Sequence, residues 1–243
     1  MFYLKSPVLS CFSTGRSTAL VVDSGANFTR TVAVHEGFCL LKSLRVAPYG
    51  GSQLSQHIEK ILSDKMGKPL LNKYALSGSN LTKSFLNFHQ NMMLSDIKEA
   101  LSVRRQEESG GDSLIHSVDY ELPDHNTITV NRSEIRDRFI LGDEGKKFKG
   151  ASVMAGESAS SCDVDIKKEL YSNILLTGGN ILYGSYVEEM ISKIGETSPP
   201  NIKVKGVSVC AAGERRYLSW IGGSIVTSLS SFQSYWVGAQ EWK

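Results

Sequence analysis

Paired cysteines and long hydrophobic runs are both missing from this sequence. The cysteines lie far apart without metal-ligand spacing, and they are Cys11, Cys39, Cys162 and Cys210. We therefore expect reduced thiols rather than a disulfide framework or a zinc site. No apolar stretch approaches the roughly 20 residues that a membrane-spanning helix needs, and the first residues lack the layout of a secretory signal. We expect no membrane partner.

A strong charge imbalance is also missing. The 27 Lys and Arg residues are nearly offset by 25 Asp and Glu, and the net charge of +2 is too small to indicate nucleic-acid binding by itself. No histidines have metal-ligand spacing, and no pair of acids or nucleophile with a base is placed for hydrolysis. The sequence therefore predicts no evident catalytic centre.

Two glycine-containing turns follow short apolar runs. The first run ends in Asp23, Ser24 and Gly25, and the second is followed by Gly178 and Gly179. A strand that ends in this way leaves a tight turn whose backbone N–H groups can face a phosphate. The helix expected after Gly179 adds a favourable dipole. The plainer alternative is an ordinary turn at each place, with Asp23 as a capping residue.

A second glycine pair, Gly222 and Gly223, lies inside an apolar, helix-like segment. A glycine in the interior of a helix weakens it unless another backbone must approach closely. We therefore expect a close contact between this segment and another part of the chain.

The hydrophobic pattern switches between strand-like alternation and helical spacing, which predicts an α/β fold with a mixed sheet. We expect exposed loops at 104–112 and 142–161, the second with room for one helix. The expected elements are a strand at 19–23, a hairpin at 29–46, a helix after residue 52, a broken helical region at 81–103, two short strands at 120–130, a strand at 173–177, a helix at 183–194, a strand at 202–209 and a packed helix at 217–232.

Taken in order, the motifs resemble the nucleotide-clasping half of the actin fold. Matches run from about residue 2 to residue 242, and the two ends are similar to the nuclear, chromatin-complex branch of the actin-related proteins. The segments that carry the resemblance are 15–25, 35–38, 95–99, 162–171 and 214–233.

The resemblance implies a ribonuclease-H-like mixed sheet with flanking helices and a smaller inserted subdomain. The large subdomain would comprise residues 1–51 and 133–243, and the inserted one residues 52–132. In the family, the first phosphate loop lies well before the residue that Asp23 matches. Too few residues precede Asp23 in this sequence to contain that loop. We therefore expect the second half of the actin fold, with weak ATP binding and a tendency to self-associate when this chain is alone.

The resemblance also implies a nucleotide site. The cofactor would be ATP or ADP with Mg or Ca in the full-length protein, with an empty site in this stretch alone as the alternative. Asp23 would approach the metal through water. On spacing alone, Lys98 and Glu99 could equally be an ordinary exposed pair, and Tyr183 a core residue. The implied cofactor-binding residues are Asp23, Ser24, Gly25, Lys98, Glu99, Gly178, Gly179, Tyr183 and Arg216.

Four residues depart from the family pattern near the phosphates. Ala26 replaces an acid and Asn27 replaces a glycine, while Arg30 and Ser6 stand where the family has a histidine and a glutamine that place the attacking water. Positioning this water needs a group that accepts from it. We therefore expect little or no hydrolysis and assign no catalytic residue.

The resemblance thus favours a non-catalytic, nucleotide-binding scaffold subunit of nuclear chromatin-remodelling or histone acetyltransferase complexes. Its partners would be actin, a helical segment of a remodeller, and histones or nucleosomes, with some of the protein in the cytoplasm. The alternative is a divergent conventional actin that forms filaments and hydrolyses ATP, but segment 147–152 is basic and small where filaments need an apolar plug. A sugar kinase or chaperone relative is a third possibility, which segments 162–171 and 220–232 oppose.

Overall fold

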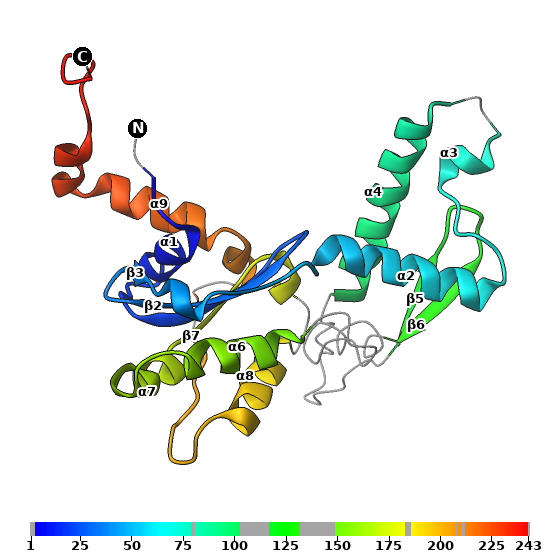
Figure 1. The fold of residues 1–243 in the computed structure, drawn as a ribbon. Coiled ribbons are helices and arrows are strands. Elements are labelled where there is room, and N and C mark those ends of the chain that lie inside the picture. Colours follow the sequence, from blue (N-terminus) through cyan, green and yellow to red (C-terminus); the bar gives the residue numbers. More distant parts are fainter. Residues whose placement is uncertain are drawn as a thin grey trace, which may run out of the picture.

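A mixed sheet with helices on both faces forms the larger part of the molecule, and a smaller group of helices and strands lies beside it (Figure 1). The structure is a computed structural model. It describes residues 3–78, 81–102, 117–131, 149–182, 186–207, 209 and 212–242.

In the sheet, β1 (Ala19–Ser24) and β7 (Ile174–Thr177) pair in parallel. The strand β2 (Thr29–His35) pairs antiparallel with β1 and also with β3 (Phe38–Cys39) and β4 (Arg45–Ala47). The order is β3-β2-β1-β7, with β4 also on β2. This confirms the expected α/β fold with a mixed sheet.

The hairpin after β2 turns where the sequence predicts. Glu36 and Gly37 both have positive φ, at 49° and 81°, which fits a two-residue turn of type I′. The expected continuous return strand is wrong, because a short 3-10 helix, η1 (Leu41–Ser43), separates β3 from β4. The Ser43 hydroxyl accepts a hydrogen bond of 2.8 Å from the Ala33 N–H, so a side chain takes the place of strand pairing there.

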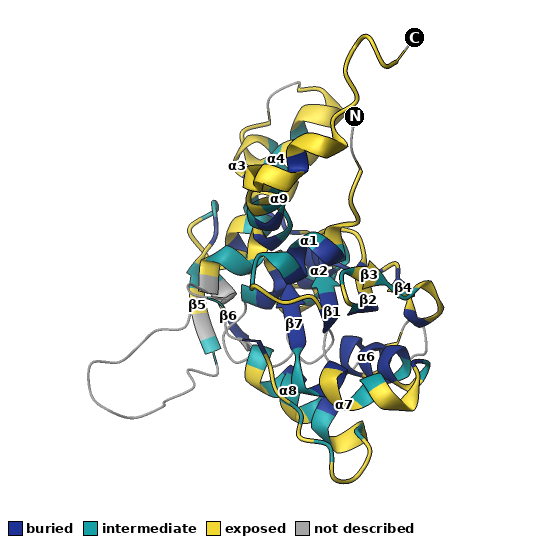
Figure 2. Cartoon of the chain, turned by 90° about the vertical axis from the view of Figure 1, so that its left-hand side faces the viewer, coloured by how far each residue is buried: buried dark blue, intermediate teal, exposed yellow. Residues whose placement is uncertain are grey.

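Helices cover both faces of the sheet (Figure 1). One face carries α1 (Ser6–Phe12) and α9 (Leu218–Ser228), and the other carries α6 (Ala151–Ser160), α7 (Val164–Ser172) and α8 (Tyr186–Thr197). Figure 2 shows β1 and β7 buried between these layers. Alternate strand residues feed the two cores: Ala19, Val21, Val32, Val34 and Leu175 face α1 and α9, whereas Leu20, Val22, Ala33, Ile174 and Leu176 face α6 to α8.

The contact between α1 and α9 explains one glycine of the pair in α9. A Cβ on Gly222 would lie 1.8 Å from the Leu9 carbonyl oxygen, so only glycine lets the two helices approach this closely. The Ser10 and Ser219 hydroxyls join the helices at 2.8 Å. The expected close approach is confirmed. The expectation that the whole segment is packed is wrong, because Leu218 and Gly222 are the buried residues of α9 and Trp220 is 75% exposed.

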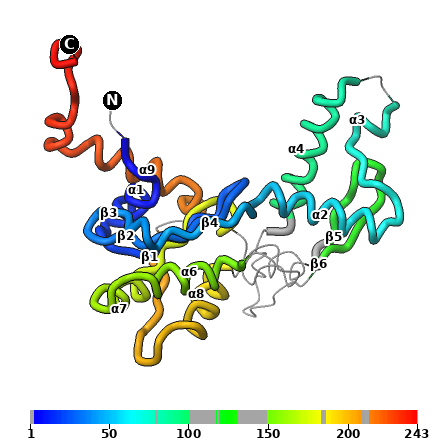
Figure 3. Tube along the Cα trace, viewed as in Figure 1, coloured from blue at the N-terminus to red at the C-terminus, as the bar shows by residue number. Residues whose placement is uncertain are grey.

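The second group of elements follows β4 along the chain, as Figure 3 shows. It contains the helices α2 (Gly51–Met66), α3 (Lys73–Leu76) and α4 (Lys83–Ser102) and the hairpin of β5 (Ser117–Glu121) with β6 (Thr127–Asn131). The two short strands are confirmed, whereas α4 is continuous rather than broken. The division at residues 52–132 stays a prediction.

The expected strand at 202–209 is reduced to one bridge, between Gly206 and Ile174. The segment still lies beside β7, because the Val207 N–H donates to the Ile174 carbonyl at 2.8 Å. Two further 3-10 helices, η2 (Gly179–Leu182) and η3 (Ala212–Arg216), flank the end of β7, and a last one, η4 (Ser230–Tyr235), follows α9.

Some sequence expectations fall outside the described residues. The loop at 104–112, Tyr183 and Cys210 are among them, as are residues 142–148 of the second expected loop. The remaining cysteines, Cys11, Cys39 and Cys162, are free thiols. Within the ranges that the structure describes, no helix has both the length and the apolar character needed to cross a membrane.

Candidate functional site

The site lies where β1 and β7 end side by side. The strands are parallel and Asp23 pairs with Thr177, so the loops that follow them start at the same edge of the sheet. Gly178 has φ of +106°, and a Cβ there would lie 2.2 Å from the Ser24 carbonyl oxygen. This glycine therefore brings the two loops into direct backbone contact.

The first loop is closed by its own backbone and held by the second. The Gly25 N–H donates to the Phe28 carbonyl at 3.0 Å, which forms the turn from β1 into β2. The buried Asn180 donates from Nδ2 to the Gly25 carbonyl at 2.7 Å and to the Ser24 hydroxyl at 3.1 Å. The Ser24 hydroxyl and the Gly25 N–H are therefore already hydrogen-bonded within the protein.

The start of α2 fixes the other side of this loop. The Gly51 N–H donates to the Gly25 carbonyl at 3.0 Å, and the Ser52 N–H donates to the Ala26 carbonyl at 2.7 Å. The Ser52 hydroxyl donates to Asn27 Oδ1 at 3.0 Å, so the Asn27 side chain is turned toward α2. A helix N-terminus normally leaves such N–H groups without partners, and here they orient the loop.

Lys98 reaches the same point from α4. Its Nζ donates to the Gly51 carbonyl and to the Ser55 hydroxyl, both at 3.2 Å. Burial lowers the pKa of Lys98 and so does nearby Arg216, while Glu99 opposes both effects. A cation that is partly withdrawn from water is a reasonable partner for an anion.

Asp23 lies opposite Arg30 across the β1–β2 ladder. Burial raises the pKa of the Asp23 carboxyl, and Arg30 partly offsets this. The Arg30 guanidinium carbon lies 5.3 Å from the centre of the Phe28 ring. No cluster of three or more His, Cys, Asp or Glu side chains that could hold a metal occurs in the part of the chain that the structure describes. A metal beside Asp23 would therefore depend on phosphate oxygens and water.

Arg215, which the sequence did not single out, fixes the loop after β7. Its carbonyl accepts from the Gly178 N–H at 3.0 Å and from the Thr177 hydroxyl at 2.8 Å. Its guanidinium donates to the Leu176 carbonyl at 3.1 Å, and burial lowers its pKa while Glu188 opposes this. Arg216 is exposed and lies 5.9 Å from the centre of the Tyr217 ring.

The structure joins four of the nine predicted cofactor-binding residues through direct contacts at one place, whereas Gly179 and Glu99 are exposed beside them. Gly179 is exposed with no atom within 4 Å of the point that a Cβ would occupy, and Glu99 lies on the exposed side of α4. Tyr183 lies outside the described residues. Asn180 was missed, although an asparagine directly after a glycine pair is a typical side chain for bridging two loops. The residues that converge are Ser24, Gly25, Lys98 and Gly178, together with Asn180 and the start of α2.

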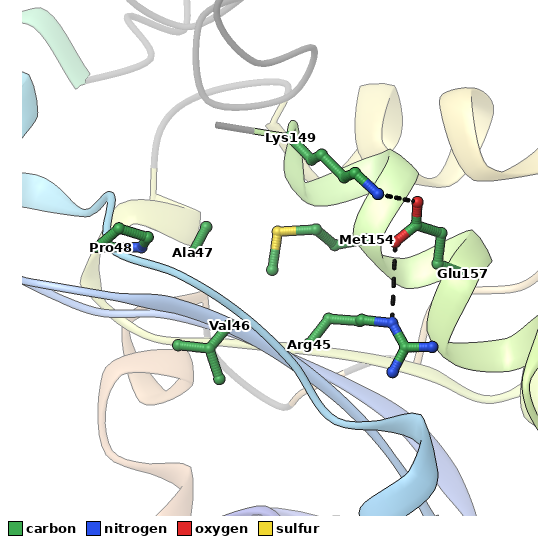
Figure 4. A pocket seen from close by; sticks show the side chains of 7 residues that line it. All are labelled: Arg45, Val46, Ala47, Pro48, Lys149, Met154 and Glu157. Atoms are coloured by element: carbon green, nitrogen blue, oxygen red, sulfur yellow. Dashed lines mark hydrogen bonds and ion pairs between the residues drawn. The ribbon is translucent and has the colours of Figure 1, made fainter. Parts of the chain in front are cut away.

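A separate pocket of about 320 Å³ lies between β4 and α6 (Figure 4). Glu157 accepts from Lys149 Nζ at 2.5 Å and lies 3.8 Å from Arg45 Nε. The carboxylate therefore offsets part of the positive charge that the sequence places near residue 149. Lys147, the other lysine of the basic segment 147–152, lies outside the described residues.

Comparisons with known proteins match this chain along its whole length. The sequence profile of the family described as Actin matches residues 1–243. The chain is 35% identical over 276 aligned residues to Actin-related protein 4 of Oryza sativa subsp. indica, and 34% identical over 277 residues to Actin-related protein 4 of Arabidopsis thaliana. Each alignment covers 100% of this chain, and the chain spans 62% of the length of each relative.

Proposed function

Because the chain belongs to the actin family and is of the actin-related type, we propose that it binds a nucleotide without appreciable turnover and serves as a scaffold subunit. The ligand would be ATP or ADP with Mg or Ca. The complexes would be nuclear ones that remodel chromatin or acetylate histones. Actin, a helical segment of a remodeller, and histones or nucleosomes would be its partners.

The observation that carries nucleotide binding is the meeting of four distant segments at one point. The Gly25 carbonyl accepts from both Asn180 and the Gly51 N–H, and the Gly51 carbonyl accepts from Lys98. Gly178 removes the side chain that would separate the two strand ends. The N–H groups of Gly25, Gly51 and Gly178 donate within the protein, so the cation of Lys98 is the feature of this rigid junction that favours an anionic ligand.

The charged residues around this junction also fit the ligand. Lys98 would line the purine and ribose side of the nucleotide, Arg216 would border the base, and Asp23 would hold a metal through water. The metal would offset the negative charge of the phosphate oxygens.

The lack of turnover rests on what surrounds Asp23. Arg30 stands opposite this carboxylate, and a guanidinium has no acceptor for a water proton. Ala26 carries no polar group, and Ser6 lies at the start of α1, where its carbonyl accepts from Ser10 and Ser219. None of these side chains has the length and the acceptor needed to hold an attacking water in line with a γ-phosphate.

The binding proposal is tested by titrating ATP into the protein at its natural length. Lys98→Met should weaken binding about tenfold or more, which corresponds to about 1.4 kcal/mol. Lys83→Met is the matched control, because Lys83 is an exposed lysine at the far end of the same helix. Unchanged affinity in Lys98→Met would contradict the proposed site.

The scaffold proposal is tested by pull-down from nuclear extract and by sedimentation under conditions in which actin polymerises. Recovery with subunits of a remodelling or acetyltransferase complex supports it. Sedimentation as filaments, without such subunits, would favour a filament-forming ATPase instead.

A further inference from the structure

The helix α4 has apolar residues on two opposite sides. One side packs into the core through Leu94 and Ile97, which are 2% and 0% exposed. The other side carries Phe88 and Met92, which are 60% and 53% exposed. Residues 88, 92, 95 and 99 repeat at the spacing of a single helix face. A surface helix normally turns polar residues to water, so this second apolar face needs its own explanation.

The second face is hollowed along its length. A shallow groove of about 400 Å³ is lined by Phe88, Asn91, Met92, Ser95, Asp96 and Glu99. Its apolar residues lie toward the N-terminal end of the helix, and its carboxylates lie toward the C-terminal end. From Met92 to Glu99 the helix advances about 10 Å, or two turns.

The acidic end of the groove is held in place. Asp96 Oδ2 accepts a hydrogen bond of 2.6 Å from the Tyr120 hydroxyl of β5. Burial and Asp96 together raise the pKa of Tyr120 to about 12, so the phenol remains a donor to the carboxylate at neutral pH. The groove therefore presents a fixed negative charge beside an apolar surface.

We propose that this α4 groove is a docking site for an amphipathic helix of another protein. The bound helix would place a leucine or aromatic side chain between Phe88 and Met92, and an arginine or lysine about two turns away, opposite Asp96 and Glu99. The occupant follows from charge complementarity, because an acidic segment would be repelled from that end. The apolar anchors of the groove, Phe88 and Met92, lie toward the N-terminal end of α4, whereas Glu99 directly follows Lys98 of the nucleotide junction.

The test is selection of binders from a random library of sixteen-residue peptides against the full chain. Enriched peptides should combine an apolar anchor with a basic residue about seven positions away. Met92→Glu should weaken their binding about tenfold or more. Val164→Glu is the matched control, because Val164 is an equally apolar residue that is 80% exposed on α7, away from the groove.

Reversing the charge gives a second, independent readout. In the double variant Asp96→Lys with Glu99→Lys, selection should change from basic to acidic peptides. Three results would overturn the proposal: no enrichment, enriched peptides that bind Met92→Glu as well as the unchanged chain, or a preference for basic peptides that survives the reversal. Self-association that Met92→Glu abolishes would also overturn it, because a second copy would then be the occupant.

Discussion

Gly178 touches the backbone of Ser24: a Cβ on Gly178 would lie 2.2 Å from the Ser24 carbonyl oxygen. This contact joins the ends of two parallel strands whose residues lie far apart in the sequence. It also fixes the position of Asn180, which donates to the Ser24 hydroxyl and to the Gly25 carbonyl. The geometry of the candidate site depends on this one glycine.

Gly178→Ala should destabilise the protein by about 2–4 kcal/mol, because it combines a steric overlap with an unfavourable positive φ. Gly179→Ala is the matched control, since no atom lies within 4 Å of its added Cβ. Urea unfolding of both variants measures the difference. Equal stability of the two variants would show that the strand ends are not in contact.

The second glycine pair offers a similar comparison on the other side of the sheet. Gly222→Ala should cost about 1–3 kcal/mol, because its Cβ would overlap the Leu9 carbonyl and push α1 away from α9. Gly223→Ala should be neutral or stabilise by up to about 1 kcal/mol through helix propensity, since its nearest contact is 3.8 Å. Thermal unfolding measures the stability of both variants. An equal change in the two would contradict the close packing of α1 on α9.

The pH dependence of stability tests the buried carboxyl of Asp23. Burial raises its folded-state pKa above 3.8, so the native state holds this proton more tightly than the unfolded state. Stability therefore falls as pH rises from 3.8 through the folded-state pKa. Asp23→Asn removes this loss, so the variant should gain stability relative to the unchanged chain as the pH rises from about 3.8 to neutrality.

Asp124 supplies the control with the opposite sign. Its hydrogen bonds with Lys68 and Asn126 lower its pKa to about 2. The contribution of Asp124 to the stability of the folded state is present above pH 3.8 and is lost as the pH falls toward 2. Asp124→Asn should therefore lose stability relative to the unchanged chain as the pH rises from about 2 to about 5. Urea titrations across this range measure both variants, and the same sign in both would contradict these assignments.

The sequence predicted the elements whose signal is local. The turn at Glu36 and Gly37, the β5–β6 hairpin and the strand that ends at Asp23 all follow from glycine, proline and alternation. The break before β4 could not be predicted, because it depends on the Ser43 hydroxyl reaching Ala33 across the sheet. The alternation at 202–209 predicted a strand, but among the residues described there only Gly206 forms a bridge with β7.

The candidate site also combines residues that a local sequence signal indicates with residues that only the fold brings together. Glycines after strand ends indicated Gly25 and Gly178, whereas the roles of Asn180 and Arg215 come from contacts between segments distant in the sequence. Lys98 was indicated by resemblance alone, since its spacing is that of an ordinary exposed lysine. Its contacts with α2 exist only in the folded chain.

The exposed face of α9 predicts self-association of this chain when it is studied alone. Trp220 and Ile225 of α9 are 75% and 43% exposed, and Leu229, which follows the helix, is 53% exposed. Large apolar side chains exposed in this way favour association in water. Light scattering over a concentration series should show a mass that rises with concentration. Trp220→Ser should reduce the rise, and Trp242→Ser, which changes a tryptophan 84% exposed outside α9, should not. A constant monomer mass up to high concentration would contradict the predicted self-association.

Phosphate release from prebound ATP separates a nucleotide-binding scaffold from an active ATPase more sharply than any binding assay. With the protein at its natural length and ATP in limiting amount, we expect the bound nucleotide to stay largely intact. The combined variant Arg30→His, Ala26→Asp and Ser6→Gln should release phosphate at least about tenfold faster, a difference of about 1.4 kcal/mol in the barrier. Phosphate release by the unchanged protein as fast as by filamentous actin would contradict the proposed lack of turnover.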